Sequence, residues 1–197
     1  MHPLLTELGV SEELQAYFYT EDLCFEYAND KEYFGEGFHL VPVTADLWMA
    51  GNYPATELII TASAMEAIAY LALNQWRHPA NAVLSFIAIG NLPHARQLGW
   101  ISSYCQKRKI TLVFGNDLLG RLADIAVASG IRGKAVRLCW QDGMVMLYLN
   151  HTAYRFAPER LSLNAFEKAA GFRTAIRTRK PTHHHSFLEQ LQHDSRQ

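Results

Sequence analysis

The feature that most constrains the fold is a regular alternation of short apolar runs with longer helical patterns between residues 57 and 130. Three runs rich in β-branched and apolar residues cover 57–61, 83–88 and 110–114. Each is followed by a run with 3.6-residue apolar spacing, and these runs cover 63–75, 92–107 and 117–129. Strands that alternate with helices form parallel sheets joined by right-handed crossovers. The sequence therefore predicts an α/β fold with a parallel sheet and helices on both faces.

The segments on either side of this core have other patterns. Residues 1–56 begin with a helix opened by Ser11 and continue as an irregular aromatic stretch, with a strand expected at residues 38–43. We interpret them as an N-terminal extension of a single domain whose core is residues 57–130.

Residues 131–197 are expected to form a C-terminal β-meander and helical extension. Gly130 is expected to end the helix before it, and the turns at Asp142-Gly143 and Asn150-His151 separate three strands. The first of these strands is a candidate for an edge of the parallel sheet. Helices are expected at 162–170 and 186–192, with a basic extended stretch between them.

Composition excludes several classes of protein. Hydrophobic residues make up 49% of the chain and charged residues 19%, which is typical of a globular domain. No apolar run reaches the roughly 20 residues that span a bilayer, and no signal peptide is visible, so we expect a cytoplasmic protein without a membrane partner. Cys24, Cys105 and Cys139 lie outside any CxxC spacing and are expected to be reduced, packed thiols.

The strand ends carry a recognisable set of residues. Ala62-Ser63 follows the first strand, with Glu66 four residues after Ala62, and the second strand is followed by Gly90-Asn91. Gly115-Asn116-Asp117 follows the third strand. In order and spacing these segments resemble the motifs of Toprim domains, the compact α/β unit of primases and topoisomerases. The likeness covers about residues 57–130 and is closest to primase-type proteins, including those of conjugative and mobilizable elements.

The resemblance also implies a degenerate active site. In Toprim enzymes a Glu acts as general acid or base and an Asp-x-Asp pair holds magnesium. Ala62 stands at the Glu position and Gly115 at the first Asp position, so only Asp117 keeps its carboxylate. The late Lys-Asp-x-Asn element of many primase-type members has its nearest counterpart at residues 185–188, without an acid. Asp117 is thus the remaining metal candidate and Mg²⁺ the one cofactor left open, with helix capping as the alternative role.

Two functions remain open at this point. The first is a non-catalytic interaction or nucleic-acid-binding module, related to DNA processing and serving a mobile element, whose partner is DNA or a DNA-processing protein. The second is a divergent Mg²⁺-dependent nucleotidyltransferase or nuclease that uses Asp117 and Glu66, with Asp124 or Asp46 as further carboxylates. The missing carboxylates favour the first function.

Charge is distributed unevenly along the chain. Residues 1–66 carry twelve Asp or Glu and one Lys, whereas residues 67–197 carry seventeen Lys or Arg and seven acids. The predicted nucleic-acid contacts are four neighbouring basic residues, namely Arg173, Arg177, Arg179 and Lys180. The alternatives are that acids of residues 7–36 pair with them or that these charges are solvated.

The sequence contains two further polar clusters. The basic cluster Lys107-Arg108-Lys109 is a further candidate for phosphate contacts, with the same alternatives. The run His183-His184-His185 is expected to be solvated rather than to bind a metal, because no Cys or His cluster elsewhere in the sequence matches it.

Overall fold

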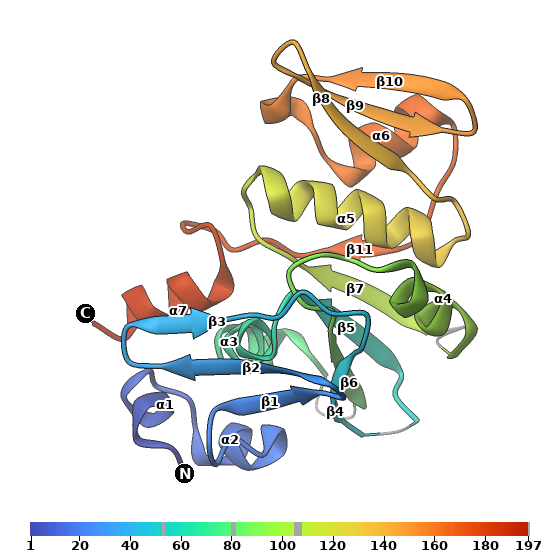
Figure 1. Ribbon diagram of the computed structural model, residues 1–197. Coiled ribbons are helices and arrows are strands. Elements are labelled where there is room, and N and C mark those ends of the chain that lie inside the picture. Colours follow the sequence, from blue (N-terminus) through green and yellow to red (C-terminus); the bar gives the residue numbers. More distant parts are fainter. Residues whose placement is uncertain (53, 80–81, 105–107, 197) are drawn as a thin grey trace.

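The centre of the protein is a five-stranded mixed sheet. The computed structural model describes residues 1–52, 54–79, 82–104 and 108–196. The strand order is β11-β7-β5-β6-β4 (Figure 1). β5 (Glu57–Thr61) lies between β6 (Leu84–Ala88) and β7 (Lys109–Val113) and is parallel to both. The three predicted core strands are therefore confirmed as neighbours in one sheet with parallel pairing.

The two edge strands were not predicted. β4 (Trp48–Gly51) pairs with β6 in antiparallel orientation, and β11 (Arg177–Thr178) pairs with β7 in parallel orientation. The expectation that the first strand of the meander joins this sheet is wrong. That edge position is taken by β11, which comes from the basic extended stretch near the C-terminus.

Helices cover both faces of the central sheet, as predicted. α3 (Ala64–Asn74), continued by the 3-10 helix η1 (Gln75–Arg77), lies on one face, while α4 (Ala95–Tyr104) and α5 (Leu118–Ile131) lie on the other (Figure 1). The alternation of side chains along β5 accounts for this arrangement. Ile59 packs in the same hydrophobic cluster as α3, whereas Leu58 and Ile60 pack in the cluster that contains α4 and α5.

The N-terminal extension is more regular than the sequence suggested. It contains α1 (Pro3–Glu7), α2 (Glu12–Phe18) and a three-stranded antiparallel sheet of β1 (Cys24–Tyr27), β2 (Asp30–Gly35) and β3 (Phe38–Leu40). Ser11 caps α2 as expected, because its side chain accepts a hydrogen bond from the backbone N–H of Leu14. This unit packs in the hydrophobic cluster on the α3 side of the central sheet.

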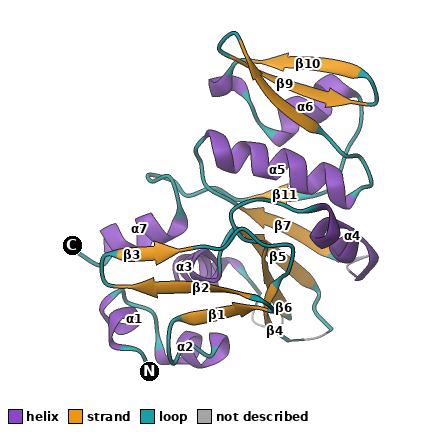
Figure 2. Ribbon diagram, viewed as in Figure 1, coloured by secondary structure: helices purple, strands orange, loops and turns teal. Residues whose placement is uncertain are grey.

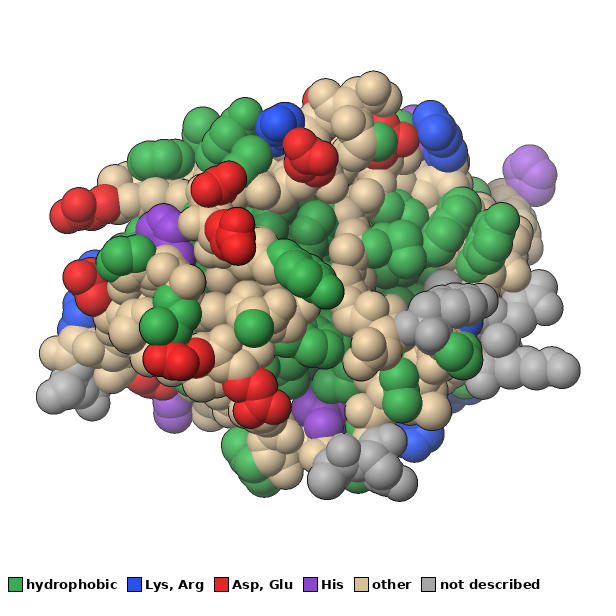
Figure 3. Space-filling view, turned by 90° about the horizontal axis from the view of Figure 1, so that it is seen from below, with side chains coloured by type: hydrophobic (Ala, Val, Ile, Leu, Met, Phe, Trp, Pro, Cys, Tyr) green, Lys and Arg blue, Asp and Glu red, His purple; other side chains and the backbone are tan. Residues whose placement is uncertain are grey.

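Most acidic side chains of the extension face solvent, while Glu32 is buried. The exposed acids are Glu7, Glu12, Glu13, Glu21, Asp22, Glu26 and Glu36. Figure 3 looks onto the protein from below and shows carboxylates scattered among apolar side chains over its left part, where basic side chains are few. For these acids the alternative that the charges are solvated therefore holds.

The C-terminal extension forms a second small unit above α5. β8 (Arg137–Gln141), β9 (Met144–Leu149) and β10 (Thr152–Phe156) form a separate antiparallel sheet, which confirms the β-meander (Figure 2). Its inward residues and α6 (Leu163–Ala170) complete the hydrophobic cluster around α5. The short 3-10 helix η2 (Pro158–Arg160) connects β10 to α6 and has no buried residue.

Three details of the C-terminal half correct or complete the predictions. Gly130 does not end α5, which continues to Ile131. Cys139 is exposed rather than packed, Cys24 is partly buried and free, and Cys105 lies outside the described residues. The last helix, α7 (Phe187–Asp194), packs against α3. Among the described residues, no helix combines the length and apolarity that a bilayer crossing requires.

Candidate functional site

A cavity of about 290 Å³ lies at the carboxyl ends of β5, β6 and β7, and we call it the strand-end crevice. The chain passes from β5 to β6 on one side and then crosses to β7 on the other, so the direction of strand addition reverses at β5. Open α/β sheets bind ligands at this kind of switch point, because the loops diverge there. Topology alone therefore makes the crevice the first place to look for function.

The crevice brings together all four predicted relic positions. Ala62, Glu66, Gly115 and Asp117 line it, together with residues that follow β6. Most of its remaining wall is apolar, formed by Val41, Ile89, Pro93, Phe114, Leu119 and Ala123. The sequence therefore predicted the location of the site, while the chemistry depends on how its carboxylates are used.

Asp117 acts as a helix cap. Its side chain Oδ1 accepts a hydrogen bond of 2.8 Å from the backbone N–H of Gly120, in the first turn of α5. An N-cap carboxylate satisfies one of the free amide groups at a helix start and is favoured by the helix dipole. The capping alternative for Asp117 is therefore realised in the structure.

Glu66 is also engaged, by the last helix. It is buried, and its two carboxylate oxygens accept hydrogen bonds from the backbone N–H groups of Phe187 at 3.0 Å and Leu188 at 3.2 Å, at the start of α7. Burial raises the pKa of Glu66, and the bonds from Ser186 and these amides oppose that rise. Glu66 therefore links α3 to α7 and does not point free oxygens into the crevice.

Glu32, which was not predicted as a site residue, is a buried carboxylate that does not line the crevice but contacts His39, which does. Its oxygens accept hydrogen bonds from the backbone N–H groups of Ala64 at 2.7 Å and Met65 at 3.0 Å, at the start of α3. The hydroxyl of Tyr27 donates to the same carboxylate at 2.7 Å, and His39 Nε2 lies 3.0 Å from it. Burial alternates along β2 and puts Glu32 on the inward face with Phe34, but this burial is seen only in the folded protein and no sequence signal marked Glu32.

The side chain of Lys180, a residue that follows β11 (Arg177–Thr178), contacts the loop after β7. The Lys180 ammonium lies 2.6 Å from Oδ2 of the buried Asp124 and donates to the carbonyl oxygens of Phe114 at 3.2 Å, Gly115 at 2.8 Å and Gly120 at 3.3 Å. Burial raises the pKa of Asp124 to about 6, while the nearby ammonium opposes the rise. Burial also lowers the pKa of Lys180. A positive charge of the protein itself thus lies among these oxygens.

These arrangements do not fit a magnesium site. Mg²⁺ requires octahedral oxygen ligands, usually from one or two carboxylates. Asp117 and Glu66 already accept amide hydrogen bonds, Asp124 is paired with Lys180, and Asp46 is paired with Arg96 at 3.3 Å. A metal ion would have to displace these partners and approach the ammonium.

Close packing explains why glycine occupies positions 115 and 120, which follow β7. A Cβ at Gly115 would lie 2.9 Å from the carbonyl oxygen of His185 and 3.0 Å from Asp117 Oδ1, and a Cβ at Gly120 would overlap the backbone of Gly115. The segment before α7 crosses this loop, since the N–H of Asn116 donates to the carbonyl of His185 at 2.7 Å. Gly115 therefore accommodates the crossing chain.

The four predicted nucleic-acid contacts divide into two pairs. Lys180 points inward, and Arg173 pairs with Glu167 at 3.1 Å, so both are engaged within the protein. Arg177 and Arg179 are exposed, and no described acid forms an ion pair with either. Pairing with residues 7–36 is therefore wrong for Arg173 and Lys180, whose acidic partners lie in the C-terminal half of the chain.

The basic cluster Lys107-Arg108-Lys109 provides fewer candidates for phosphate contacts. Lys107 lies outside the described residues, Arg108 is partly buried and has an interaction partner, and Lys109 is exposed at the start of β7.

The histidine run has one metal-like contact. Ligand atoms of His184, His193 and Asp194 lie within 4.8 Å of one another on the surface around α7. Exposed groups of this kind are common without an ion, so the grouping does not assign a metal site. His193 and Asp194 are exposed, and His193 Nδ1 lies 3.5 Å from Asp194 Oδ1.

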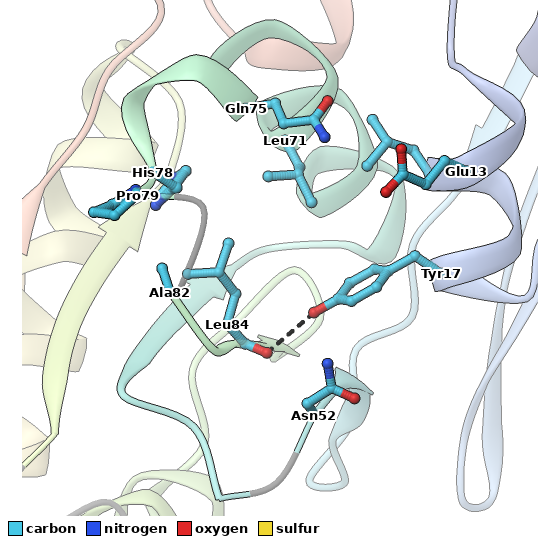
Figure 4. A pocket seen from close by; sticks show the side chains of 10 residues that line it. Glu13, Tyr17, Asn52, Leu71, Gln75, His78, Pro79, Ala82 and Leu84 are labelled. Atoms are coloured by element: carbon cyan, nitrogen blue, oxygen red, sulfur yellow. Dashed lines mark hydrogen bonds between the residues drawn. The ribbon is translucent and has the colours of Figure 1, made fainter.

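Another cavity, of about 240 Å³, lies at the other end of the central strands from the crevice, near the start of β6 (Figure 4). Tyr17 points across it from α2, and its hydroxyl donates to the carbonyl oxygen of Leu84 at 3.0 Å. Its walls join the N-terminal extension to α3 and β6. Glu13, Gln75 and His78 are further polar residues of its lining, and none of them was predicted as a site residue.

Comparisons with known proteins add no relative. No family model matches this chain, and neither a curated protein nor a solved structure matches it.

Proposed function

We propose that this chain is a non-catalytic, Toprim-like module that binds nucleic acid. The observation that carries the proposal is that the carboxylates around the strand-end crevice are all engaged by backbone amides, or in the case of Asp124 by the Lys180 ammonium. Catalysis by a Toprim-type site depends on carboxylates that are free to hold metal ions. The resemblance to primase-type proteins of mobile elements suggests DNA transfer or replication as the setting.

The topology supports the family part of the proposal. The relic positions follow adjacent parallel strands and line one crevice, as a Toprim-like core requires. Fold does not fix function, so binding needs its own support.

Support for binding comes from uncompensated charge. Arg177 and Arg179 project from the edge strand β11 and the residue after it, and they have no acidic partner among the described residues. Guanidinium groups bind phosphates with paired donors, and such contacts dominate the affinity of proteins for nucleic acids.

The alternative, a Mg²⁺-dependent nucleotidyltransferase or nuclease, would require Glu66 and Asp117 to release the starts of α7 and α5. Each buried amide left without a partner costs about 1–3 kcal/mol. Metal binding in the enzyme alternative would therefore destabilise the starts of α5 and α7.

The two functions are separated by assaying purified protein for DNA binding and for Mg²⁺- or Mn²⁺-dependent cleavage and primer synthesis. We expect binding without turnover. Asp117→Asn is the informative variant, because asparagine still caps a helix but is a weaker metal ligand. Metal-dependent activity that Asp117→Asn abolishes would overturn the proposal, and so would the absence of any DNA binding.

A further inference from the structure

A polar cavity of about 390 Å³ lies at the β11 edge of the central sheet, and we call it the edge cavity. It is bounded on one side by the end of α3 and η1, and on the other by the chain from β11 to α7. Its lining includes Trp76, Arg77 and Arg179 and contains no acidic residue. It is separate from the strand-end crevice and lies where the positive charge of the C-terminal segment is exposed.

Trp76 and Arg77 form a stacked pair at the mouth of this cavity. Trp76 is 74% exposed, which is unusual for an indole, and the guanidinium carbon of Arg77 lies 4.3 Å from the centre of its ring. Exposed aromatic rings stacked with guanidinium groups are the surfaces on which unpaired bases stack.

Arg179 brings a second guanidinium to the same place. Its backbone N–H donates to the carbonyl of Leu112 at 2.8 Å, so the backbone that carries it is fixed to the sheet edge while its side chain stays exposed. Arg77 and Arg179 both line the cavity. Burial raises the pKa of the nearby Tyr70, the charges of Arg179 and Arg77 oppose that rise, and the charge of Glu57 adds to it.

The cavity wall is held in place by further contacts. The Lys180 ammonium is anchored in the loop after β7, and the N–H of Thr182 donates to the side chain of Gln190 at 3.2 Å. The hydroxyls of Thr178 and Thr182 add polar groups to the lining. A site with fixed walls loses little conformational entropy on binding.

We infer that the edge cavity binds one nucleotide unit of a single-stranded nucleic acid, with the base stacked on the Trp76–Arg77 pair and the phosphate held by Arg77 and Arg179. Bases within a duplex are already stacked on both faces, so one exposed stacking pair selects an unpaired base. Arg177, two residues before Arg179, continues the positive charge along the edge strand, which suits a strand rather than a free nucleotide. This inference rests on the proposed function and specifies its surface.

The test measures fluorescence anisotropy of a labelled oligothymidine with wild-type protein, Trp76→Ala, and the double variant Arg77→Ala/Arg179→Ala. We expect Trp76→Ala to weaken binding about tenfold without a change of charge, since stacking contributes about 1–3 kcal/mol per base. The double variant should weaken binding and lower the slope of log affinity against log salt by about 0.7, the value for one single-strand phosphate contact.

The matched control is Arg155→Ala/Lys168→Ala, which removes the same charge from exposed positions on the C-terminal unit. Its affinity should stay within about twofold of the wild type, and all variants should keep the wild-type melting temperature, because exposed substitutions change stability by about 0.5 kcal/mol at most.

The outcomes separate the two proposals. If the wild type binds neither single- nor double-stranded DNA, the proposed function fails. If the wild type binds but Trp76→Ala and the double variant bind equally well, only the edge cavity is excluded. Thymidine monophosphate that competes as tightly as the oligonucleotide would assign the cavity to a free nucleotide, and equal competition by polyglutamate would overturn base stacking.

Discussion

The Nζ atom of Lys180 lies 2.6 Å from Oδ2 of Asp124, and the other oxygen of Asp124 is buried without a hydrogen-bond partner. The pair joins the chain after β11 to helix α5. Since Lys180 also donates to the carbonyl oxygens of Phe114, Gly115 and Gly120, one side chain holds together the chain after β11, the loop after β7 and the start of α5.

Replacing Lys180 with Ala should destabilise the protein in a pH-dependent way. The pKa of Asp124 is raised from 3.8 to about 6, so the folded chain retains a proton there that the unfolded chain has lost, and this group lowers stability as the pH rises from about 4 to 6. Without the Lys180 ammonium the pKa of Asp124 should rise further, so the loss of stability with rising pH should continue to higher pH. We expect Lys180→Ala to cost about 3 kcal/mol at pH 8 and about 1 kcal/mol at pH 5, measured by urea unfolding.

The control for this prediction is the double variant Lys180→Met/Asp124→Leu. Apolar replacement of both partners of a buried pair is often neutral, so most of the loss at pH 8 should be recovered. A pH-independent effect of Lys180→Ala would contradict the assignment of a proton to Asp124.

Removing the Glu66 carboxylate should cost more than removing that of Asp117. Glu66→Ala leaves two amides of α7 buried without partners and should lower the free energy of unfolding by about 3 kcal/mol, whereas Asp117→Ala removes one exposed cap and should cost about 1 kcal/mol. Thermal melting of both variants checks the order. Equal effects would mean that α7 does not depend on Glu66.

Glu32→Ala should be among the most destabilising single changes. It leaves the Tyr27 hydroxyl, the His39 ring and two amides of α3 without their acceptor, and we expect a loss of about 4 kcal/mol or more. Glu36→Ala, which removes an exposed acid near the same sheet, serves as the control and should change stability by less than about 0.5 kcal/mol. Comparable melting temperatures for the two variants would show that the buried network contributes little.

Adding carboxylates at the positions that resemble the Toprim motif should not create a metal site. Ala62→Glu/Gly115→Asp adds two acids, but a Cβ at Gly115 is only 2.9 Å from the carbonyl of His185, so we expect about 1–3 kcal/mol of destabilisation. Millimolar Mg²⁺ should leave the melting temperature of this variant unchanged. A rise of several degrees with Mg²⁺, absent in Ala62→Glu alone, would show that the site can still be rebuilt.

The basic segment should separate into binding and structural residues. Arg177→Ala/Arg179→Ala should weaken DNA binding with little effect on stability, because both side chains are exposed. Arg173→Ala/Lys180→Ala should instead lower the melting temperature, since both residues have partners within the protein. Gel shifts at low salt and thermal melting together distinguish the pairs, and the reverse pattern would contradict the division.

Local sequence patterns predicted the core well. β5, β6 and β7 were recognisable as β-branched runs before helical patterns, and the helix expected at 162–170 is α6, which Ser162 caps. β11 was missed because its two residues have no periodicity and are ordered only by pairing with Thr111 and Leu112.

The site was predictable in place and not in chemistry. Ala62, Gly115 and Asp117 were placed by strand ends, which are local features of the sequence. Glu32 depends on amides 32 and 33 residues away, and Lys180 on carbonyls at least 60 residues away, so no local pattern reveals either role.

Glu66 and its two amide donors are separated by 121 and 122 residues. A ribosome makes the chain from the N-terminus, so α3 leaves the exit tunnel long before Phe187 and Leu188 have been joined to the chain. During that interval the Glu66 carboxylate lacks its partners, Lys180 has not reached Asp124, and β7 has no edge strand. This fold therefore cannot be completed before residues 187 and 188 have left the ribosome, and ribosome-bound chains that stop before residue 187 should remain open to proteases.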